Sequence, residues 1–203
     1  MYRRSMRARQ VGESCYNLVV PRLFLALDLP DEVDMDIQMM SGGIPGARWQ
    51  KPEQLHLTLH FLGEVDGGVM RRLIAALGQL EAPAFELGLR GAGVFPPRGQ
   101  PRVIWLGVDP PEPVRVLHQR SARILDELGL ERERRKFSPH VTVARLRKEA
   151  RAEQVGSWVQ GHALYRSARF MVDHVRLYSS ITAARGAKYT CEAMFELEPA
   201  EDS

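Results

Sequence analysis

The sequence has little cysteine and no long apolar segment. Its two cysteines, Cys15 and Cys191, form neither a metal-ligand spacing nor a disulfide framework, so a reducing cytoplasm is expected. No apolar run approaches the roughly 20 residues that a membrane span needs. The arginine-rich residues 1–20 are not followed by an apolar segment, so they do not resemble a secretory signal. We therefore expect a cytoplasmic protein that does not associate with membranes.

Excess charge is also absent from most of the chain. Residues 1–20 hold four arginines and one glutamate, which account for the whole net charge of +3 of the 203 residues. We expect residues 1–20 to form a loose extension and residues 21–203 to form a single domain. Residues 131–151 are locally basic, with eight lysines and arginines against three glutamates. Such a run is usually a solvated face, but it also suits an anionic substrate.

The hydrophobic periodicity predicts alternating strands and helices. The expected strands cover residues 22–29, 47–50, 55–63, 85–95, 102–108, 139–145, 168–179 and 187–197, and the expected helices cover residues 31–41, 66–80, 112–128 and 150–161. This pattern predicts an α+β fold with mainly antiparallel sheets flanked by helices. The order strand, helix, strand, helix occurs twice, which indicates an internal duplication. We expect two pseudo-symmetric lobes around a central cleft.

Two of these strands carry the same short motif. His56 and Thr58 lie two residues apart between leucines, and His140 and Thr142 lie two residues apart between valines. Because successive side chains of a strand point to opposite faces, each histidine shares a face with its threonine. One copy alone is typical of any amphipathic strand. Two copies in matching settings favour a functional interpretation.

Two histidines that face each other can act as a general acid and a general base. With ordinary pKa values near 6.5, one ring can be neutral while the other is protonated. In-line attack at phosphorus needs such a pair, one group taking a proton from the nucleophile and the other giving one to the leaving oxygen. The threonine hydroxyls could bind the non-bridging phosphate oxygens. This arrangement requires no metal ion.

The paired motifs resemble those of the two-histidine phosphoesterases. The similarity rests on the strand over residues 22–27, on residues 56–63 and on residues 137–147, and it extends over residues 21–197. The most similar branch is the bacterial and archaeal RNA 2′,3′-cyclic phosphodiesterases, first named 2′–5′ RNA ligases. The resemblance implies two lobes around a cleft and an RNA substrate that ends in a 2′,3′-cyclic phosphate.

The same resemblance implies a role for each motif residue. His56 would be the proton donor to the leaving 3′ oxygen, and His140 would be the proton acceptor that activates water, so that a 2′-phosphate remains on the RNA. Thr58 and Thr142 would hold the phosphate. Arg145 resembles a basic residue that the family often has there, and it is a candidate phosphate-binding residue.

Two of the positions near the motifs are less sharply defined. Strict alternation places Arg145 on the face opposite His140, so phosphate contact requires a bend or a strand end; a surface arginine is the equally supported alternative. His60 occupies a position where many relatives have arginine or lysine. Alternation places it on the face of His56, as a third polar contact or an incidental neighbour.

Aromatic residues complete the list of candidates. Phe24 and Tyr178 could stack on a terminal base, as aromatic residues do with single-stranded RNA, although core packing is the alternative for Phe24. A metal site is not expected, because His56 and His60 would lie about 13 Å apart on a strand and no third ligand is nearby. We expect no cofactor and a monomer.

Three functions remain open at this level. Hydrolysis of RNA 2′,3′-cyclic phosphate ends is the leading hypothesis, and small cyclic nucleotides or nicotinamide-derived cyclic phosphates are further candidate substrates. A non-catalytic RNA-end-binding protein is the second hypothesis, and a ligase that runs the reverse reaction is the third. Both motifs are intact, which favours an enzyme over the binding protein.

Overall fold

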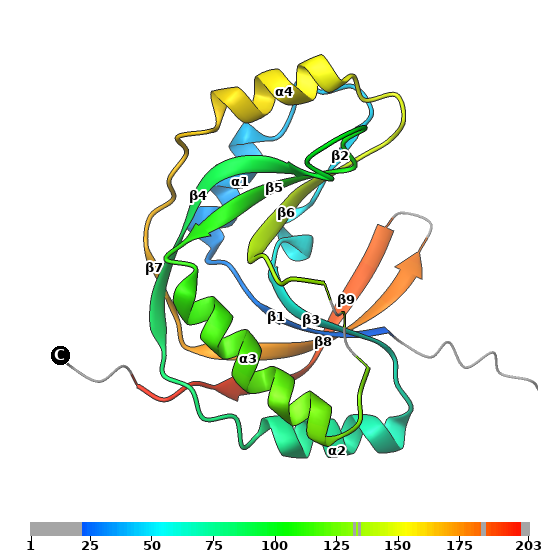
Figure 1. Ribbon diagram of the computed structural model, residues 1–203, viewed down its shortest axis with the longest axis vertical. Coiled ribbons are helices and arrows are strands. Elements are labelled where there is room, and N and C mark those ends of the chain that lie inside the picture. The colour runs from blue at the N-terminus through cyan, green and yellow to red at the C-terminus, as the bar shows by residue number, and fades with distance from the viewer. Residues whose placement is uncertain (1–21, 132, 134, 184–185, 200–203) are drawn as a thin grey trace, which may run out of the picture.

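The computed structural model describes residues 22–199 except residues 132, 134, 184 and 185 (Figure 1). The expected extension over residues 1–20 lies outside the described residues. The elements are β1 (Arg22–Leu27), α1 (Asp31–Met40), β2 (Ala47–Trp49), the short 3₁₀ helix η1 (Pro52–Gln54), β3 (Leu57–Glu64), α2 (Gly67–Leu77), β4 (Phe85–Phe95), β5 (Val103–Asp109), α3 (Glu112–Glu127), β6 (His140–Leu146), α4 (Ala152–Gly161), β7 (Phe170–Val172), β8 (His174–Ala183) and β9 (Gly186–Glu196).

The strands of the described residues form one curled sheet whose named strand pairs are all antiparallel. Its order is β7-β4-β5-β6-β3-β1-β8-β9, and β2 pairs with β6. A single residue pair, Leu57 with Val141, joins β3 to β6 at the centre. In Figure 1, α2 and α3 lie at one end of the molecule while α1 and α4 lie at the other. The predicted α+β class with antiparallel pairing is confirmed.

The internal duplication is visible in the topology. The order β1–α1–β3–α2–β4 recurs as β5–α3–β6–α4–β8; the short strands β2 and β7 and the final strand β9 are additional to this repeat. On one side of the central pair lies a first half-sheet, β9-β8-β1-β3, and on the other lies a second half-sheet, β6-β5-β4-β7. β4 and β8 are therefore exchanged, because each belongs to the half-sheet opposite the strands that precede it in sequence.

Apolar side chains of the central strands form the core. Leu57 and Val141 are fully buried, and Leu59 and Val143 are nearly so. The helices cover these side chains with their apolar faces, since each helix alternates buried and exposed positions at helical spacing. At the start of α2, the carboxylate of Asp66 caps the helix by accepting hydrogen bonds from the first amides. The opposite face of the central strands is left for polar side chains.

One predicted strand is wrong. The single strand expected over residues 168–179 is two strands, separated at Asp173. β7 pairs with β4 in the second half-sheet, whereas β8 pairs with β1 in the first. The apolar pattern continues across the break because Val172 and Val175 are both buried, so periodicity alone does not reveal it.

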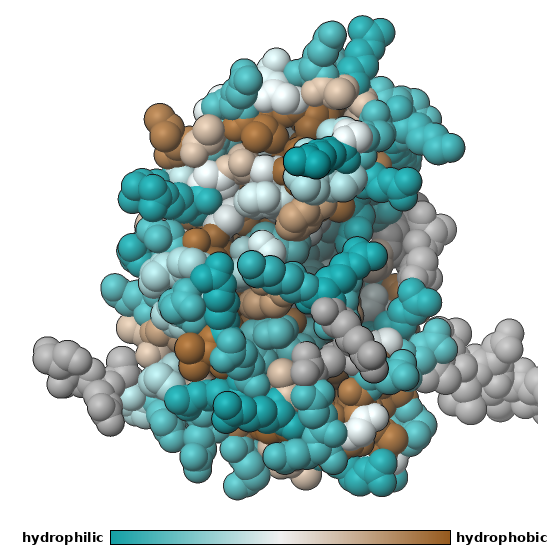
Figure 2. Space-filling view, in the orientation of Figure 1, coloured by the Kyte–Doolittle hydropathy of each residue, from teal (hydrophilic) through white to brown (hydrophobic). Residues whose placement is uncertain are grey.

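The outer surface is mainly hydrophilic. On the face shown in Figure 2, apolar side chains lie in separate small patches among polar ones. None of the helices in the described part of the chain has the length and apolar character that crossing a membrane requires.

Candidate active site

The central strand pair brings the two motifs together. β3 and β6 are antiparallel at Leu57 and Val141. Extending this register by one residue in each direction places His56 opposite Thr142, and Thr58 opposite His140. Directly opposite residues of antiparallel strands share a face, and it is the face away from buried Leu57 and Val141. Two segments more than 80 residues apart thus place both His-Thr pairs on one face at the centre of the sheet, which we call the site face.

His56 lies just before β3 and is enclosed by aromatic rings. Its ring centroid is 4.9 Å from that of Phe24 and 5.3 Å from that of Tyr189. Burial is the main reason that the pKa of His56 is lowered to about 4, and a hydrogen bond to the Gln54 carbonyl and the charge of Asp28 only partly oppose this shift. His56 is therefore neutral in the free protein near pH 7.

Positive charge acts on His56 in the same direction as burial. Arg145 and His140 both lower the pKa of His56, so both groups lie within electrostatic reach of its ring. An anion bound between these groups would reverse the effect, because it favours the protonated imidazole. The His56 imidazole is thus expected to gain a proton when an anionic ligand binds.

His140, the first residue of β6, is held in one orientation. Its Nδ1 lies 2.7 Å from the carbonyl oxygen of Ser138 and donates a hydrogen bond to it. In the neutral ring this leaves Nε2 without a proton, as a proton acceptor. Burial lowers the pKa of His140, which keeps it neutral near pH 7. Phe95 and Trp105 flank the ring at centroid distances of 5.0 and 6.3 Å.

A β-bulge in β6 decides where Arg145 points. Trp105 of β5 pairs with Thr142 and the preceding residue pairs with Ala144, so Val143 is the extra residue. Consequently Val143 and Ala144 are both buried, and Arg145 emerges exposed on the face of Thr142. The bulge shifts the alternation by one residue, so it provides the bend that phosphate contact by Arg145 requires, and phosphate binding by Arg145 stays a prediction.

The first motif contains the same irregularity. Ala26 of β1 pairs with Thr58 and the preceding residue pairs with His60, so Leu59 is the extra residue. His60 consequently points away from the site face and is only 4% exposed. Its Nε2 lies 3.0 Å from Ser121 Oγ of α3. The expectation that His60 shares the face of His56 is wrong.

Phe61 takes the place on the site face that alternation assigned to His60. It follows His56 by five residues, as Arg145 follows His140, and it pairs with Phe24 of β1. Its side chain is 54% exposed, and its ring centroid lies 6.2 Å from that of Phe24. Phe61 was not predicted from the sequence, although its five-residue spacing from His56 matches that of Arg145 from His140 and marks the equivalent position.

The two residues predicted to stack on a base differ in accessibility. Phe24 is 3% exposed and packs between His56 and Tyr178, so the stacking prediction is wrong for Phe24, which instead supports the His56 ring. Tyr178 is half-buried, and its hydroxyl donates a hydrogen bond of 2.6 Å to Asp28 Oδ1. Arg176 Nη1 lies 2.6 Å from the other oxygen of Asp28. Base stacking by Tyr178 stays a prediction.

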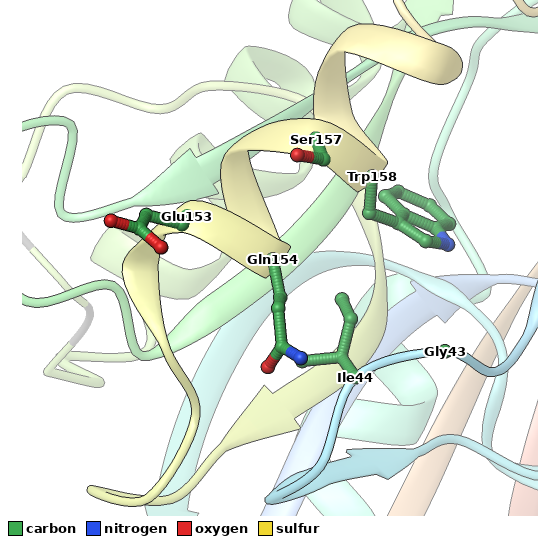
Figure 3. A pocket seen from close by; sticks show the side chains of 6 residues that line it. All are labelled: Gly43, Ile44, Glu153, Gln154, Ser157 and Trp158. Carbon is green, nitrogen blue, oxygen red and sulfur yellow. The ribbon is translucent and has the colours of Figure 1, made fainter.

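Neither of two pockets in the described part of the chain is lined by His56 or His140. One, of about 400 Å³, is lined by Asp28, Leu55 and Tyr178 among others. A larger one, of about 530 Å³, lies between the segment after α1 and α4, where Ile44 and Trp158 line it (Figure 3). The larger pocket contains none of the predicted site residues. Within the described ranges, no three histidine, cysteine or acidic side chains are grouped so that they could hold a metal ion.

The duplicated fold and the paired histidines at its centre define a protein of the two-histidine phosphoesterase class. The chain belongs to the 2′–5′ RNA ligase superfamily, whose family model matches residues 30–183. Among curated relatives, an RNA 2′,3′-cyclic phosphodiesterase of Archaeoglobus fulgidus is 30% identical over 178 residues, which cover 86% of this chain and 99% of the relative. Another RNA 2′,3′-cyclic phosphodiesterase, from Thermus thermophilus, is 37% identical over 164 residues, which cover 72% of this chain and 81% of the relative.

Solved structures agree with this assignment. A Thermus thermophilus protein superposes with a TM-score of 0.73 at 28% identity, covering 89% of this chain and all of that one. E. coli LigT in complex with 3′-AMP superposes with a TM-score of 0.71 at 30% identity, covering 87% of this chain and 98% of LigT.

Proposed function

We propose that this protein hydrolyses RNA 2′,3′-cyclic phosphate ends to 2′-phosphomonoesters, with His56 and His140 as an acid–base pair and without a metal ion. The observation that carries this proposal is the antiparallel pairing at Leu57 and Val141, which sets His56 and His140 on one face with a threonine opposite each. The name shared by curated relatives, RNA 2′,3′-cyclic phosphodiesterase, supports the reaction.

In this mechanism the cyclic phosphate lies between the two imidazoles. Nε2 of His140 accepts a proton from water as the water oxygen bonds to phosphorus. The hydrogen bond from Nδ1 of His140 to Ser138 favours this role, because it leaves Nε2 without a proton. The bond from phosphorus to the 3′ oxygen breaks, and His56 donates a proton to that oxygen. The products are a 2′-phosphate and a 3′-hydroxyl. His140 then releases its proton to solvent, and His56 takes one up.

Three side chains on the site face bind the phosphate in this proposal. The hydroxyls of Thr58 and Thr142 donate hydrogen bonds to the non-bridging oxygens, and Arg145 adds a positive charge. Since His56 is neutral in the free protein, it gains its proton together with the anionic substrate. Its action as a cytoplasmic monomer remains a prediction from the sequence.

The test uses an RNA that ends in a 2′,3′-cyclic phosphate, with identification of the product isomer. We expect only the 2′-phosphate, with the same rate in the presence of a chelator. His56→Gln and His140→Gln should each lower kcat by about 10²–10⁴-fold while the melting temperature stays near that of the wild type. A 3′-phosphate product, loss of activity with the chelator, or full activity of either variant would contradict the mechanism. Tight binding without product would favour an RNA-end-binding protein.

The family name supports ligation as a second candidate. In ligation the 5′-hydroxyl of another RNA takes the place of water, and His140 would accept its proton in the same way. Supplying a 5′-hydroxyl RNA together with the cyclic phosphate RNA tests this reaction, because a longer 2′–5′-linked product would then form.

A further inference from the structure

Two arginines lie directly opposite each other beside the proposed catalytic site. β2 pairs with β6 just beyond the bulge, and in that pairing Arg48 is the partner of Arg145. Directly opposite residues share a face, so both side chains lie on the site face, and both are exposed. Two positive charges on one face of neighbouring strands create a local positive potential that attracts an anion approaching that face. The pair is therefore suited to binding anionic groups.

Electrostatic effects connect the pair to the imidazoles. Burial raises the pKa of Tyr189, while Arg145 and Arg48 both lower it, so both guanidinium groups lie within reach of the Tyr189 hydroxyl. The Tyr189 ring is 5.3 Å from that of His56. Arg145 also lowers the pKa of His56 directly, so of the two arginines Arg145 is the one assigned to the reacting phosphate.

The backbone around Arg48 is firmly held. The neighbouring Trp49 points to the opposite face, where its ring centroid lies 5.3 Å from that of Trp158 in α4. Gly46 lies so close to Ala150 that a β-carbon at position 46 would come within 2.8 Å of the Ala150 nitrogen. The backbone that carries Arg48 is therefore fixed before any ligand binds, which lowers the entropy cost of binding.

We propose that Arg48 binds a second phosphate of the substrate, the phosphodiester on the 5′ side of the nucleotide that carries the cyclic phosphate. This inference rests on the proposed function and specifies its substrate as an RNA chain. With Arg145 on the reacting phosphate, Arg48 holds the next phosphate along the strand. A nucleoside 2′,3′-cyclic phosphate with a free 5′-hydroxyl lacks that group and cannot use Arg48.

Arg48→Gln tests the assignment with two matched substrates. One is an oligoribonucleotide that ends in a 2′,3′-cyclic phosphate, and the other is the corresponding nucleoside 2′,3′-cyclic phosphate. We expect Arg48→Gln to lower kcat/KM for the oligonucleotide roughly tenfold relative to kcat/KM for the nucleoside. The loss should appear as a higher KM for the oligonucleotide, because one charge-assisted contact is lost. The slope of log kcat/KM against log salt should become shallower by about 0.7 for the oligonucleotide.

Two controls sharpen the test. Arg123→Gln removes an exposed arginine of α3 and should leave the ratio unchanged. An oligonucleotide whose last phosphodiester is replaced by a neutral methylphosphonate should be hydrolysed equally well by the wild type and by Arg48→Gln. If wild-type protein hydrolyses neither natural substrate, the proposed function is wrong. If it hydrolyses both and Arg48→Gln leaves the ratio unchanged, the phosphodiester assignment is wrong while the proposed function stands.

Discussion

The imidazole of His60 lies 3.0 Å from Ser121 Oγ and 3.0 Å from the carbonyl oxygen of His118, so it ties β3 to α3 on the side of the sheet away from His56. Two histidines four residues apart on one chain segment therefore have different tasks. His56 is the proposed proton donor, whereas His60 satisfies polar groups of a buried helix face.

Replacing His60 should affect stability far more than activity. His60→Ala removes a buried ring and leaves Ser121 without this partner, so the free energy of unfolding should fall by about 2–4 kcal/mol. Urea denaturation measures this loss. At a temperature where the variant is folded, kcat/KM should stay within about threefold of the wild type. A hundredfold loss of kcat/KM would instead indicate that His60 takes part in catalysis.

The pH dependence should differ between the free and the substrate-bound enzyme. The pKa of His56 is lowered to about 4 and that of His140 lies below its usual value of 6.5. Because kcat/KM reports the free enzyme, its optimum should lie below pH 6.5 and its value should decline at higher pH. Bound phosphate favours the protonated rings, so the optimum of kcat should lie at higher pH. Coincident optima for kcat and kcat/KM would contradict the coupling of protonation to substrate binding.

Asp28 should influence this profile through charge. Its carboxylate raises the pKa of His56. Asp28→Asn should therefore lower the fraction of His56 that is protonated, so that kcat/KM falls by a similar factor at pH 5 and pH 7 and its decline on the acid side begins at a lower pH. A variant with reduced kcat/KM whose acid-side decline is not shifted would show that Asp28 acts only through its contacts with Tyr178 and Arg176.

Gly93 is required for the position of Trp105. A β-carbon at residue 93 would come within 2.2 Å of the indole, which lies across β4 and flanks His140. Gly93→Ala should therefore cost about 1–3 kcal/mol of unfolding free energy through overpacking, and it should lower kcat by displacing the indole toward His140. Gly156→Ala in α4 is the matched control, because nothing lies within 4 Å of its β-carbon position. This control should stabilise the protein by up to about 1 kcal/mol without changing kcat.

Asp34 makes stability depend on pH. Burial, together with the nearby charges of Asp31 and Asp28, raises the pKa of Asp34 to about 7. The folded protein therefore holds a proton that the unfolded chain releases above about pH 4, so the unfolding free energy should decrease as the pH rises from about 4 to 7. Allowing for solvent screening of this half-exposed group, Asp34→Asn should be about 1–2 kcal/mol more stable than the wild type at pH 8 and equal to it near pH 4. Parallel stability curves for the two proteins would contradict the shifted pKa.

Much of the site follows from the sequence because its pattern is local. The spacing of His56 and Thr58 fixes their common face, and the repeat at His140 and Thr142 indicates a second strand of the same kind. The helices also follow from periodicity, as α3 over Glu112–Glu127 shows against an expected range of 112–128.

The positions of Arg145, His60 and Phe61 do not follow in this way. Each lies beyond a bulge, and a bulge is a property of two paired strands, since it appears only where Thr142 and Ala144 meet consecutive residues of β5. The buried residues on either side, such as Val143 and Ala144, resemble ordinary strand residues in the sequence. The exchange of β4 and β8 is equally invisible, because pairing between distant segments depends on the whole fold.

That exchange has a consequence for dividing the polypeptide. A fragment that ends within the exposed loop at residues 96–100 keeps β1 and β3 but lacks β8, which covers the other edge of β1. The complementary fragment keeps β5 and β6 but lacks β4, the other neighbour of β5. Each piece alone is expected to remain unfolded, while co-expression of both should restore a native complex, detectable by co-purification. Although the sequence contains two repeats, each repeat contributes a strand to the half-sheet of the other, so the two repeats must fold together.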